Sequence, residues 1–359
     1  MTLRAPIPIA VVTGFLGAGK TTLLNKLLRD PALADALVIV NEWGEIGLDH
    51  LLIERVDGDV ILLASGCLCC TLRGDLVDAL RDLAERRAGG LIAPFNRIVI
   101  ETSGLADPAP ILHAIMTGSQ LAARYRFAGL VTVVDAVNGL ATLRDIEEAA
   151  RQAALADILA IAKSDLVDAA DRPPALAALR ARLHALNPGA PVLDVAAGEF
   201  SAAALIALDP SLGPSVGRAT PPAEVGPSPR GRHRADVRGY SLRLASPIGD
   251  QAFALFLALL RGRLGPGLLR VKGLLAMAAH PSEPLVIHGV QHLLHPLRRL
   301  RAWPDADRQT RIVVIVDGRD RADVEELWAA LAGAPRIDAP DLAALTLSPL
   351  SLPRGGLLG

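Results

Sequence analysis

The segment GFLGAGKT, residues 14–21, has the residue types and the spacing of a phosphate-binding loop. Its glycines let backbone N–H groups surround phosphate oxygens without a Cβ in the way, and the helix that follows adds the positive end of its dipole. In this motif the lysine reaches the β and γ phosphates, and the threonine hydroxyl binds Mg²⁺. A glycine-rich turn that binds nothing is the alternative. The residues predicted to contact the nucleotide here are Gly14, Gly17, Ala18, Gly19, Lys20, Thr21 and Thr22.

A carboxylate ends the apolar run RIVIE, residues 97–101. P-loop enzymes place an acidic group for the Mg²⁺ shell or the attacking water at such a strand end. Gly104 follows, and its N–H could sense the γ phosphate. An ordinary strand-end carboxylate is the alternative for Glu101. We favour the catalytic interpretation, in which Lys20, Thr21 and Glu101 form the hydrolytic set, with Thr21 and Glu101 as the Mg²⁺ ligands.

The segment AKSD, residues 162–165, follows the apolar run ILAIA at the place where guanine-specific proteins carry N-K-x-D. Asp165 can accept hydrogen bonds from the N1–H and the amino group of guanine, a pair that adenine lacks, and the Lys163 stem can lie over the base. Ala162 occupies the asparagine position, and the missing contact could cost about 1–3 kcal/mol if its partner were left unsatisfied. We therefore expect a weakened but retained preference for GTP, while use of ATP hinges on Ala162.

All three cysteines of the chain, Cys67, Cys69 and Cys70, lie in the short stretch GCLCC. Such a cluster is too tight to join distant segments by disulfides, so the chain is expected in a reducing compartment, the cytoplasm. Free cysteines often pack in a small apolar turn, which is one interpretation of this stretch. Thiolates are also soft donors suited to Zn²⁺ and similar ions, which is the other.

Apolar runs alternate with helical patterns through the first two hundred residues and must position these groups. Strands are expected at residues 9–13, 37–41, 60–63, 97–101, 130–135 and 158–162, and helices at residues 20–30, 76–87, 108–116 and 146–157. Runs of this type are typical of strands buried on both faces and joined by crossover helices. The pattern predicts an α/β fold, a doubly wound, mostly parallel sheet that forms a P-loop GTPase domain over residues 1–208.

Residues 209–235 are rich in Gly, Pro, Ala and Ser, which predicts a linker. Beyond it, strands are expected at residues 237–246, 268–278, 284–290 and 310–318, and helices at residues 249–264 and 322–333. Outward charges on these strands indicate one wet face, and hence a smaller α+β domain with an antiparallel sheet over residues 236–335. Residues 336–359 lack periodicity and are expected to form a loose tail.

The charges nearly balance, with 37 basic and 38 acidic residues, so nothing global indicates nucleic acid or an anionic membrane as partner. No apolar stretch free of charge reaches the roughly 18 residues of a membrane helix. We expect neither nucleic acid nor membrane as partner, and homo-oligomerisation stays open. His288, His292 and His295 have a spacing that could suit a helix, but a strand at His288 would spoil that face, and we favour surface or core roles for them.

Five segments together resemble the CobW-like family of P-loop GTPases, which handle metals and carry a CobW C-terminal domain. They are GFLGAGKTTLLNKLL, NEWGEIGLD, GCLCC, ETSGLADP and AKSDLVD, in that order along the chain. LLRVKGLLAM, LVIHGVQH and the closing strand are similar to the family's C-terminal domain. The resemblance implies a cytosolic GTPase, using GTP and Mg²⁺, whose nucleotide state is coupled to Zn²⁺ or Co²⁺ and to delivery of that metal to a client metalloprotein.

The same resemblance implies that Cys67, Cys69 and Cys70 are the transition-metal ligands. Neighbouring cysteines do not easily bind one ion with relaxed geometry, so Cys67 and Cys69 are expected to be the firmer pair, and Glu45 is a further candidate ligand or Mg²⁺ partner. GTP would order residues 42–49 and 101–107 and so change the metal affinity of the loop between them. The alternative is a nucleotide-dependent assembly or scaffold protein with structural cysteines and little or no hydrolysis.

Overall fold

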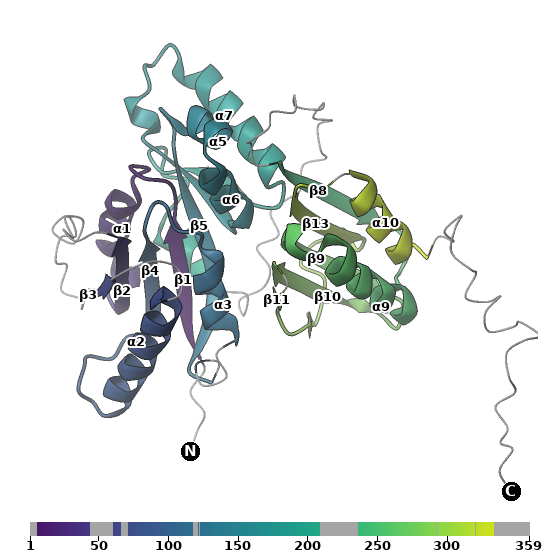
Figure 1. Ribbon diagram of the computed structural model, residues 1–359, viewed down its shortest axis with the longest axis horizontal. Coiled ribbons are helices and arrows are strands. Elements are labelled where there is room, and N and C mark those ends of the chain that lie inside the picture. Colours follow the sequence, from purple (N-terminus) through teal and green to yellow (C-terminus); the bar gives the residue numbers. More distant parts are fainter. Residues whose placement is uncertain are drawn as a thin grey trace, which may run out of the picture.

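The computed structural model describes residues 6–43, 60–65, 71–117, 121, 123–208, 236–291, 293–319 and 321–333 of the 359-residue chain. The predicted linker at residues 209–235 and tail at residues 336–359 lie outside the described residues. Two sheets stand side by side in Figure 1, and each has helices packed on it.

The first sheet is parallel throughout, with the strand order β3-β2-β4-β1-β5-β6-β7. Its strands are β1 (Ile7–Thr13), β2 (Ala36–Trp43), β3 (Val60–Ser65), β4 (Arg97–Thr102), β5 (Tyr125–Asp135), β6 (Ile158–Ala162) and β7 (Val192–Asp194). β1 and β4 are buried at every position, as expected of central strands covered on both faces. The predicted doubly wound α/β fold is therefore confirmed.

Helices cover both faces of this sheet. They are α1 (Lys20–Leu28), α2 (Thr71–Ala88), α3 (Ala109–Thr117), α5 (Gly139–Asp145), α6 (Glu147–Leu155), α7 (Arg172–Leu186) and α8 (Ala202–Ala207). One apolar core joins one face to α1 and α8, and a larger core joins the other face to α2, α3, α5, α6 and α7. The sequence patterns did not predict α5, α7, α8 or β7, since three of these are very short and α7 has little amphipathic character.

The second sheet is antiparallel, with the order β11-β10-β9-β13-β8 and β12 beside β10. Its strands are β8 (Val237–Leu244), β9 (Leu268–Met277), β10 (His280–Val290), β11 (Leu293–Leu294), β12 (Arg298–Arg299) and β13 (Thr310–Asp317). The helices α9 (Asp250–Leu259) and α10 (Arg321–Leu331) share one apolar core with one face of this sheet. The smaller α+β unit is confirmed.

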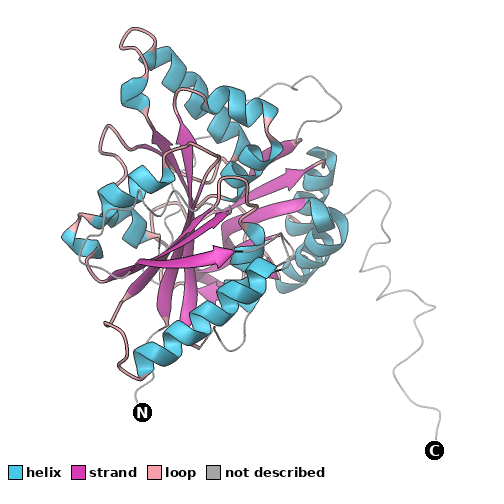
Figure 2. Cartoon of the chain, turned by 60° about the vertical axis from the view of Figure 1, so that its left-hand side comes forward, coloured by secondary structure: helices cyan, strands magenta, loops and turns pink. Residues whose placement is uncertain are grey.

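The other face of the second sheet is where the structure departs from expectation. We expected it to meet solvent, but it packs against α6 and α7 of the first unit, which lie beside β8 in Figure 1. Figure 2 shows the strands of the two sheets in the interior of the molecule, with helices around them. Apolar side chains of this face, Val237, Leu269, Val290 and Ile315, belong to the larger core of the first unit. Arg270 on β9 is only 2% exposed. Arg270 therefore lies in the interface between the two units and not on a wet surface. Arg243 on β8, by contrast, has a side chain that is 49% exposed.

No helix within the described part of the chain is both long enough and apolar enough to span a membrane.

Candidate nucleotide site

The predicted phosphate loop lies between the end of β1 and the start of α1, as its motif requires. Gly14, Gly17 and Gly19 all have positive φ angles, of 145°, 70° and 98°. A Cβ at Gly14 would lie 2.3 Å from the carbonyl oxygen of Val133 on β5, so no other residue fits there. The loop therefore takes its shape from glycines at fixed positions, which is what sequence spacing can reveal.

Lys20 begins α1 and folds back over the loop. Its Nζ donates to the carbonyl oxygen of Gly14 at 2.9 Å, and the residue is 9% exposed. The ammonium group thus lies over the backbone of the loop, where it can meet phosphate oxygens.

Thr21 and Glu101 meet beside the loop. β1 and β4 are parallel neighbours with Val12 opposite Glu101, so the carboxylate comes to the same edge of the sheet as the loop. The Thr21 Oγ1 donates to Glu101 Oε1 at 2.8 Å, and Glu101 is 4% exposed. Hydroxyl and carboxylate oxygens are the hard donors that Mg²⁺ prefers. The donor set therefore fits the predicted magnesium site.

Gly104 lies directly against the phosphate loop. A Cβ at this position would come within 2.6 Å of the backbone nitrogen of Leu16. The carbonyl oxygens of Gly104 and Ala106 accept hydrogen bonds from Gln152 on α6. The segment that follows Glu101 is therefore held between the loop and a helix. Gln152 was not predicted, although a glutamine among the alanines of residues 149–154 is a signal in the sequence.

On the base side of the site, Lys163 has φ 61° and donates from Nζ to the carbonyl oxygen of Gly17 at 2.6 Å and to Asp135 Oδ2 at 3.0 Å. Burial would raise the pKa of the Asp135 carboxyl, but hydrogen bonds from Lys163 and from two backbone N–H groups hold that pKa below its usual value. Asp165 is exposed at the next turn. Asp135 was not predicted as a site residue. It is the last residue of the apolar strand β5, and Glu101 is likewise the last but one of β4.

A second unpredicted carboxylate fixes the loop that carries Lys163. Asp194 at the end of β7 is 4% exposed and accepts from Ser164 Oγ at 2.7 Å. Its Oδ1 also accepts from the N–H of Ala196 at 2.9 Å. This carboxylate joins the ends of β6 and β7, so the backbone around Lys163 and Asp165 is tied to the sheet.

A cavity of about 230 Å³ opens beside the phosphate loop. It is lined by residues 15–18 of the loop, by the end of β5 including Asp135, by α5 and α6, and by Lys163. The cavity therefore lies at the same edge of the first sheet as the phosphate loop, Asp135 and Lys163.

The metal ligands implied by the family resemblance, Cys67, Cys69, Cys70 and Glu45, lie outside the described residues. Among the residues that are described, no group of three or more His, Cys, Asp and Glu side chains could hold a metal ion. His288 lies on β10, as expected, and its ring stacks on that of His295 with centroids 4.3 Å apart.

This fold and this loop define a P-loop nucleotide-binding protein. Residues 8–194 match the family model described as CobW/HypB/UreG, nucleotide-binding domain, and residues 237–332 match the cobalamin synthesis protein cobW C-terminal domain. The chain belongs to the CobW/HypB/UreG family and is a P-loop GTPase.

The chain is also similar to individual relatives. It is 32% identical to the zinc chaperone YjiA of Escherichia coli (strain K12), over 91% of this chain and 98% of the relative. It is 31% identical to the zinc chaperone CobW of Pseudomonas aeruginosa, over 92% of this chain and 93% of the relative. The zinc-regulated GTPase metalloprotein activator 1 of Schizosaccharomyces pombe is 32% identical over 54% of this chain and 47% of the relative.

Crystal structures of the first relative share the fold. The zinc-bound YjiA GTPase of E. coli superposes with a TM-score of 0.69 at 28% identity, covering 93% of this chain and all of that chain. A zinc-bound triple mutant of YjiA, in which one glutamate and two cysteines are replaced by alanine, superposes with a TM-score of 0.70.

Proposed function

We propose that this GTPase is a metallochaperone or metal-insertion activator. It couples its nucleotide state to binding of Zn²⁺ or Co²⁺ at Cys67, Cys69 and Cys70, and it passes the ion to a client metalloprotein. The observation that carries the hydrolytic part is the contact between Thr21 and Glu101 beside a fully formed phosphate loop. The zinc chaperone and zinc-regulated relatives support the metal-handling part.

In this mechanism the backbone N–H groups of Gly14–Thr22 and the Lys20 ammonium bind the phosphates. Thr21 and Glu101 would hold Mg²⁺, and the ion would supply positive charge to offset that of the phosphates. Glu101 lies on a buried central strand, so the backbone that carries its carboxylate is fixed before nucleotide binds. Gly104 lies against the loop, where its N–H can respond to the γ phosphate.

Base selection falls to Asp165 and Lys163 in this proposal. The buried Ala162 offers no hydrogen bond to guanine, so Asp165 carries the preference. Competition for binding should favour GTP over ATP by about tenfold or more, the value of one charge-assisted hydrogen bond. An Asp165→Ala variant should bind the two nucleotides about equally. Equal binding by the unaltered protein would contradict this assignment.

The metal site in this proposal consists of the three thiolates, with Glu45 as a candidate fourth ligand. The zinc-bound triple mutant of YjiA shows that zinc can be bound to that protein after one glutamate and two cysteines are removed. Zinc binding alone is therefore a weak test. The discriminating quantity is the change in metal affinity between nucleotide states.

The experiment is a calorimetric titration of Zn²⁺ and of Co²⁺ into the protein with a GTP analogue, with GDP and without nucleotide. We expect affinities that differ by about tenfold between nucleotide states, within the usual range of allosteric coupling. A Cys67→Ala, Cys69→Ala, Cys70→Ala variant should lose that difference. Equal affinities in all three states would refute the coupling. Phosphate release no faster than from a Lys20→Ala control would favour the scaffold alternative.

We also propose that the chain divides into residues 1–208 and 236–335, that residues 209–235 link them, and that the protein works in the cytoplasm. Limited trypsin digestion should cut first within residues 209–235, which contain several arginines. First cleavage inside β9 or α6 would contradict this division.

A further inference from the structure

Gln152 holds the segment that follows the hydrolytic carboxylate. It lies in the middle of α6 and is 1% exposed. Its Nε2 donates to the carbonyl oxygens of Gly104 at 3.2 Å and Ala106 at 3.0 Å. Both partners are acceptors, so only the amide nitrogen can face them. The hydroxyl of Thr132 donates to the carbonyl oxygen of Gln152 at 2.7 Å and anchors the helix on β5.

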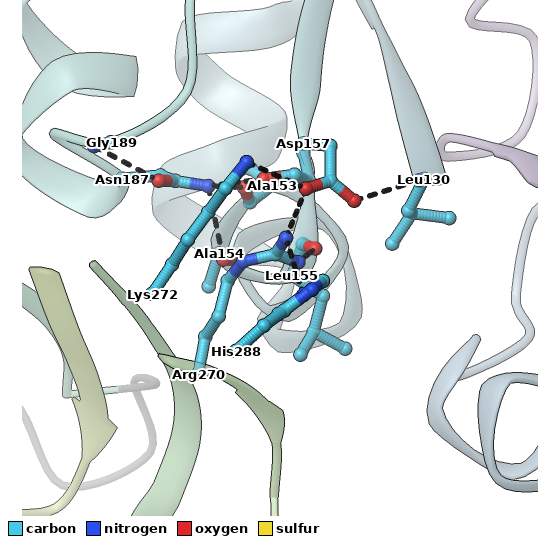
Figure 3. Close-up of polar contacts among 11 residues, drawn as sticks. Leu130, Ala153, Ala154, Leu155, Asp157, Asn187, Gly189, Arg270, Lys272 and His288 are labelled. Carbon is cyan, nitrogen blue, oxygen red and sulfur yellow. Dashed lines mark hydrogen bonds and ion pairs between the residues drawn. The ribbon is translucent and has the colours of Figure 1, made fainter. Parts of the chain in front are cut away.

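The carboxyl end of α6 is held by Asn187 of the first unit and by Arg270 of the second unit. Three carbonyl oxygens, those of Ala153, Ala154 and Ala156, accept from Asn187 Nδ2 at 3.1, 3.0 and 2.9 Å. The carbonyl oxygen of Leu155 accepts from the guanidinium of Arg270 on β9. A cation is favourable at this end of a helix, where unpaired carbonyl groups and the dipole are negative. Figure 3 shows Arg270 reaching this helix end from the second sheet.

Asp157, two residues beyond α6, completes the connection. Its carboxylate pairs with Arg270 and, at 3.1 Å, with Lys272 Nζ, and it also accepts from the N–H of Leu130 at 3.0 Å. Burial would raise the pKa of this carboxyl, but the two cations hold it below its usual value. Arg270 and Lys272 are two apart on β9 and so face the same side. An ionised cluster therefore crosses the interface between the units (Figure 3).

Arg151 makes a further connection at the adjacent position of α6. Its guanidinium donates to Asp317 Oδ2, at the end of β13, at 3.1 and 2.7 Å. Successive residues of one helix therefore contact the second sheet and the segment beside the phosphate loop. Because α6 is a short helix, a displacement at one of these contacts can reach the others as a shift of the whole helix.

We propose that α6 couples the nucleotide site to the second sheet, with Gln152 as the positioning residue. Gln152 holds Gly104 in place, and movement of Gly104 with the γ phosphate shifts α6 and its contacts with Arg270 and Asp317. Because coupling acts in both directions, a displacement of the second sheet would also alter the nucleotide site. This inference rests on the proposed response of Gly104 to nucleotide, but it is independent of the cysteines and of any metal.

The test is amide hydrogen exchange of the full chain with GDP and with a non-hydrolysable GTP analogue, without added metal. Peptides covering β9 and β13 should exchange at rates that differ about threefold or more between the two nucleotides, a change in local opening energy that the method resolves. Gln152→Met keeps the side-chain length but has no N–H donor, and it should remove this difference. Glu148→Gln, on an exposed turn of the same helix, is the matched control and should retain it.

The kcat and KM of a Gln152→Glu variant, compared with those of the unaltered protein, show whether Gln152 positions the site or only stabilises the fold. Gln152→Glu places a carboxylate against two carbonyl oxygens, so kcat for GTP hydrolysis should fall about tenfold or more while KM changes little. A purely structural role would instead lower stability without this split between kcat and KM.

Two outcomes would overturn the proposal. One is an unaltered protein whose β9 and β13 peptides exchange equally with both nucleotides, and the other is a Gln152→Met variant that keeps the full difference. If Gln152→Met does not fold, as judged by circular dichroism, Arg151→Gln replaces it and should reduce the difference in β13. Equal metal affinities in all nucleotide states would refute the metal coupling but would not change the hydrogen-exchange result, which is obtained without added metal. The two proposals can therefore fail separately.

Discussion

Replacing Asp157 by asparagine tests the buried ion pair between the two units. The carboxylate serves three donors, the N–H of Leu130 and the side chains of Arg270 and Lys272. Asparagine has the same shape but only one acceptor oxygen, and its NH₂ group must face one of these donors whichever way the amide turns. The substitution therefore removes the charge and also creates a donor facing a donor.

The size of the effect follows from burial. The side chains of Asp157 and Arg270 are 6% and 2% exposed, so water cannot replace the lost partner. Breaking such a buried pair from one side costs about 3–5 kcal/mol, a large part of the stability of a domain. For comparison, Arg144 and Asp145 form a surface pair at 2.8 Å with side chains 60% and 47% exposed. Pairs of that kind contribute about 0–1 kcal/mol.

The assay is urea unfolding followed by far-ultraviolet circular dichroism. We expect Asp157→Asn to lower the midpoint by about 1–2 M, which is about 3–5 kcal/mol at a slope of about 3 kcal/mol per molar. Asp145→Asn is the control and should stay within about 0.5 kcal/mol of the unaltered protein.

A loss of less than about 1 kcal/mol in Asp157→Asn would refute the burial argument, because it would mean that the interface relaxes or admits water. A second variant sharpens the test. Adding Arg270→Met to Asp157→Asn removes the more buried of the two cations that lose their partner and should recover part of the loss. No recovery would locate the cost in the Leu130 hydrogen bond and not in the ion pair.

Three further predictions concern the site and the pH response. Lys20→Ala should weaken GTP binding about 10- to 100-fold in a fluorescent-nucleotide assay, the value of its charge-assisted contacts with phosphate; unchanged affinity would contradict its role. Gly104→Ala should slow GTP hydrolysis about tenfold or more, because its Cβ would push on the backbone of Leu16; a normal rate of phosphate release would contradict the close packing. Burial lowers the pKa of His288 well below 6.5 and that of His295 to about 4. Both stay neutral in the folded protein while the unfolded chain binds protons, so stability should fall by about 1 kcal/mol per histidine over the first pH unit below about 6.5. Urea midpoints across that range check this, and a flat profile would contradict the burial of the rings.

The sequence predicts which groups meet beside the phosphate loop, because these groups follow strand ends at fixed spacing. Lys20 and Thr21 are defined by the glycines before them, and Glu101 by the apolar run that it ends. Those features are local, so they can be read without knowledge of packing. Asp135 is of the same kind and could have been found by the same rule.

The contacts across the two units could not be predicted in this way. Arg270 and Asp157 are 113 residues apart in the chain. A strand with outward charges at intervals, such as residues 237–246, is typical of a sheet with a solvated face, and this led to the wrong expectation for that face of the second sheet. Only the partner surface, formed by α6 and Asp157, shows that Arg270 is buried. Sequence periodicity records that a face is polar but not what covers that face.

The apolar core that both units share has a consequence for biosynthesis. The side chains of Val237, Leu269, Val290 and Ile315 complete a core whose other members precede residue 208. Ribosomes add about 5–20 residues per second, so the first unit waits on the order of 5–20 s for the last strand of the second sheet. During that interval the second sheet does not cover the surface of α6 and α7, and the nascent chain should bind chaperones that recognise exposed apolar side chains until β13 is made.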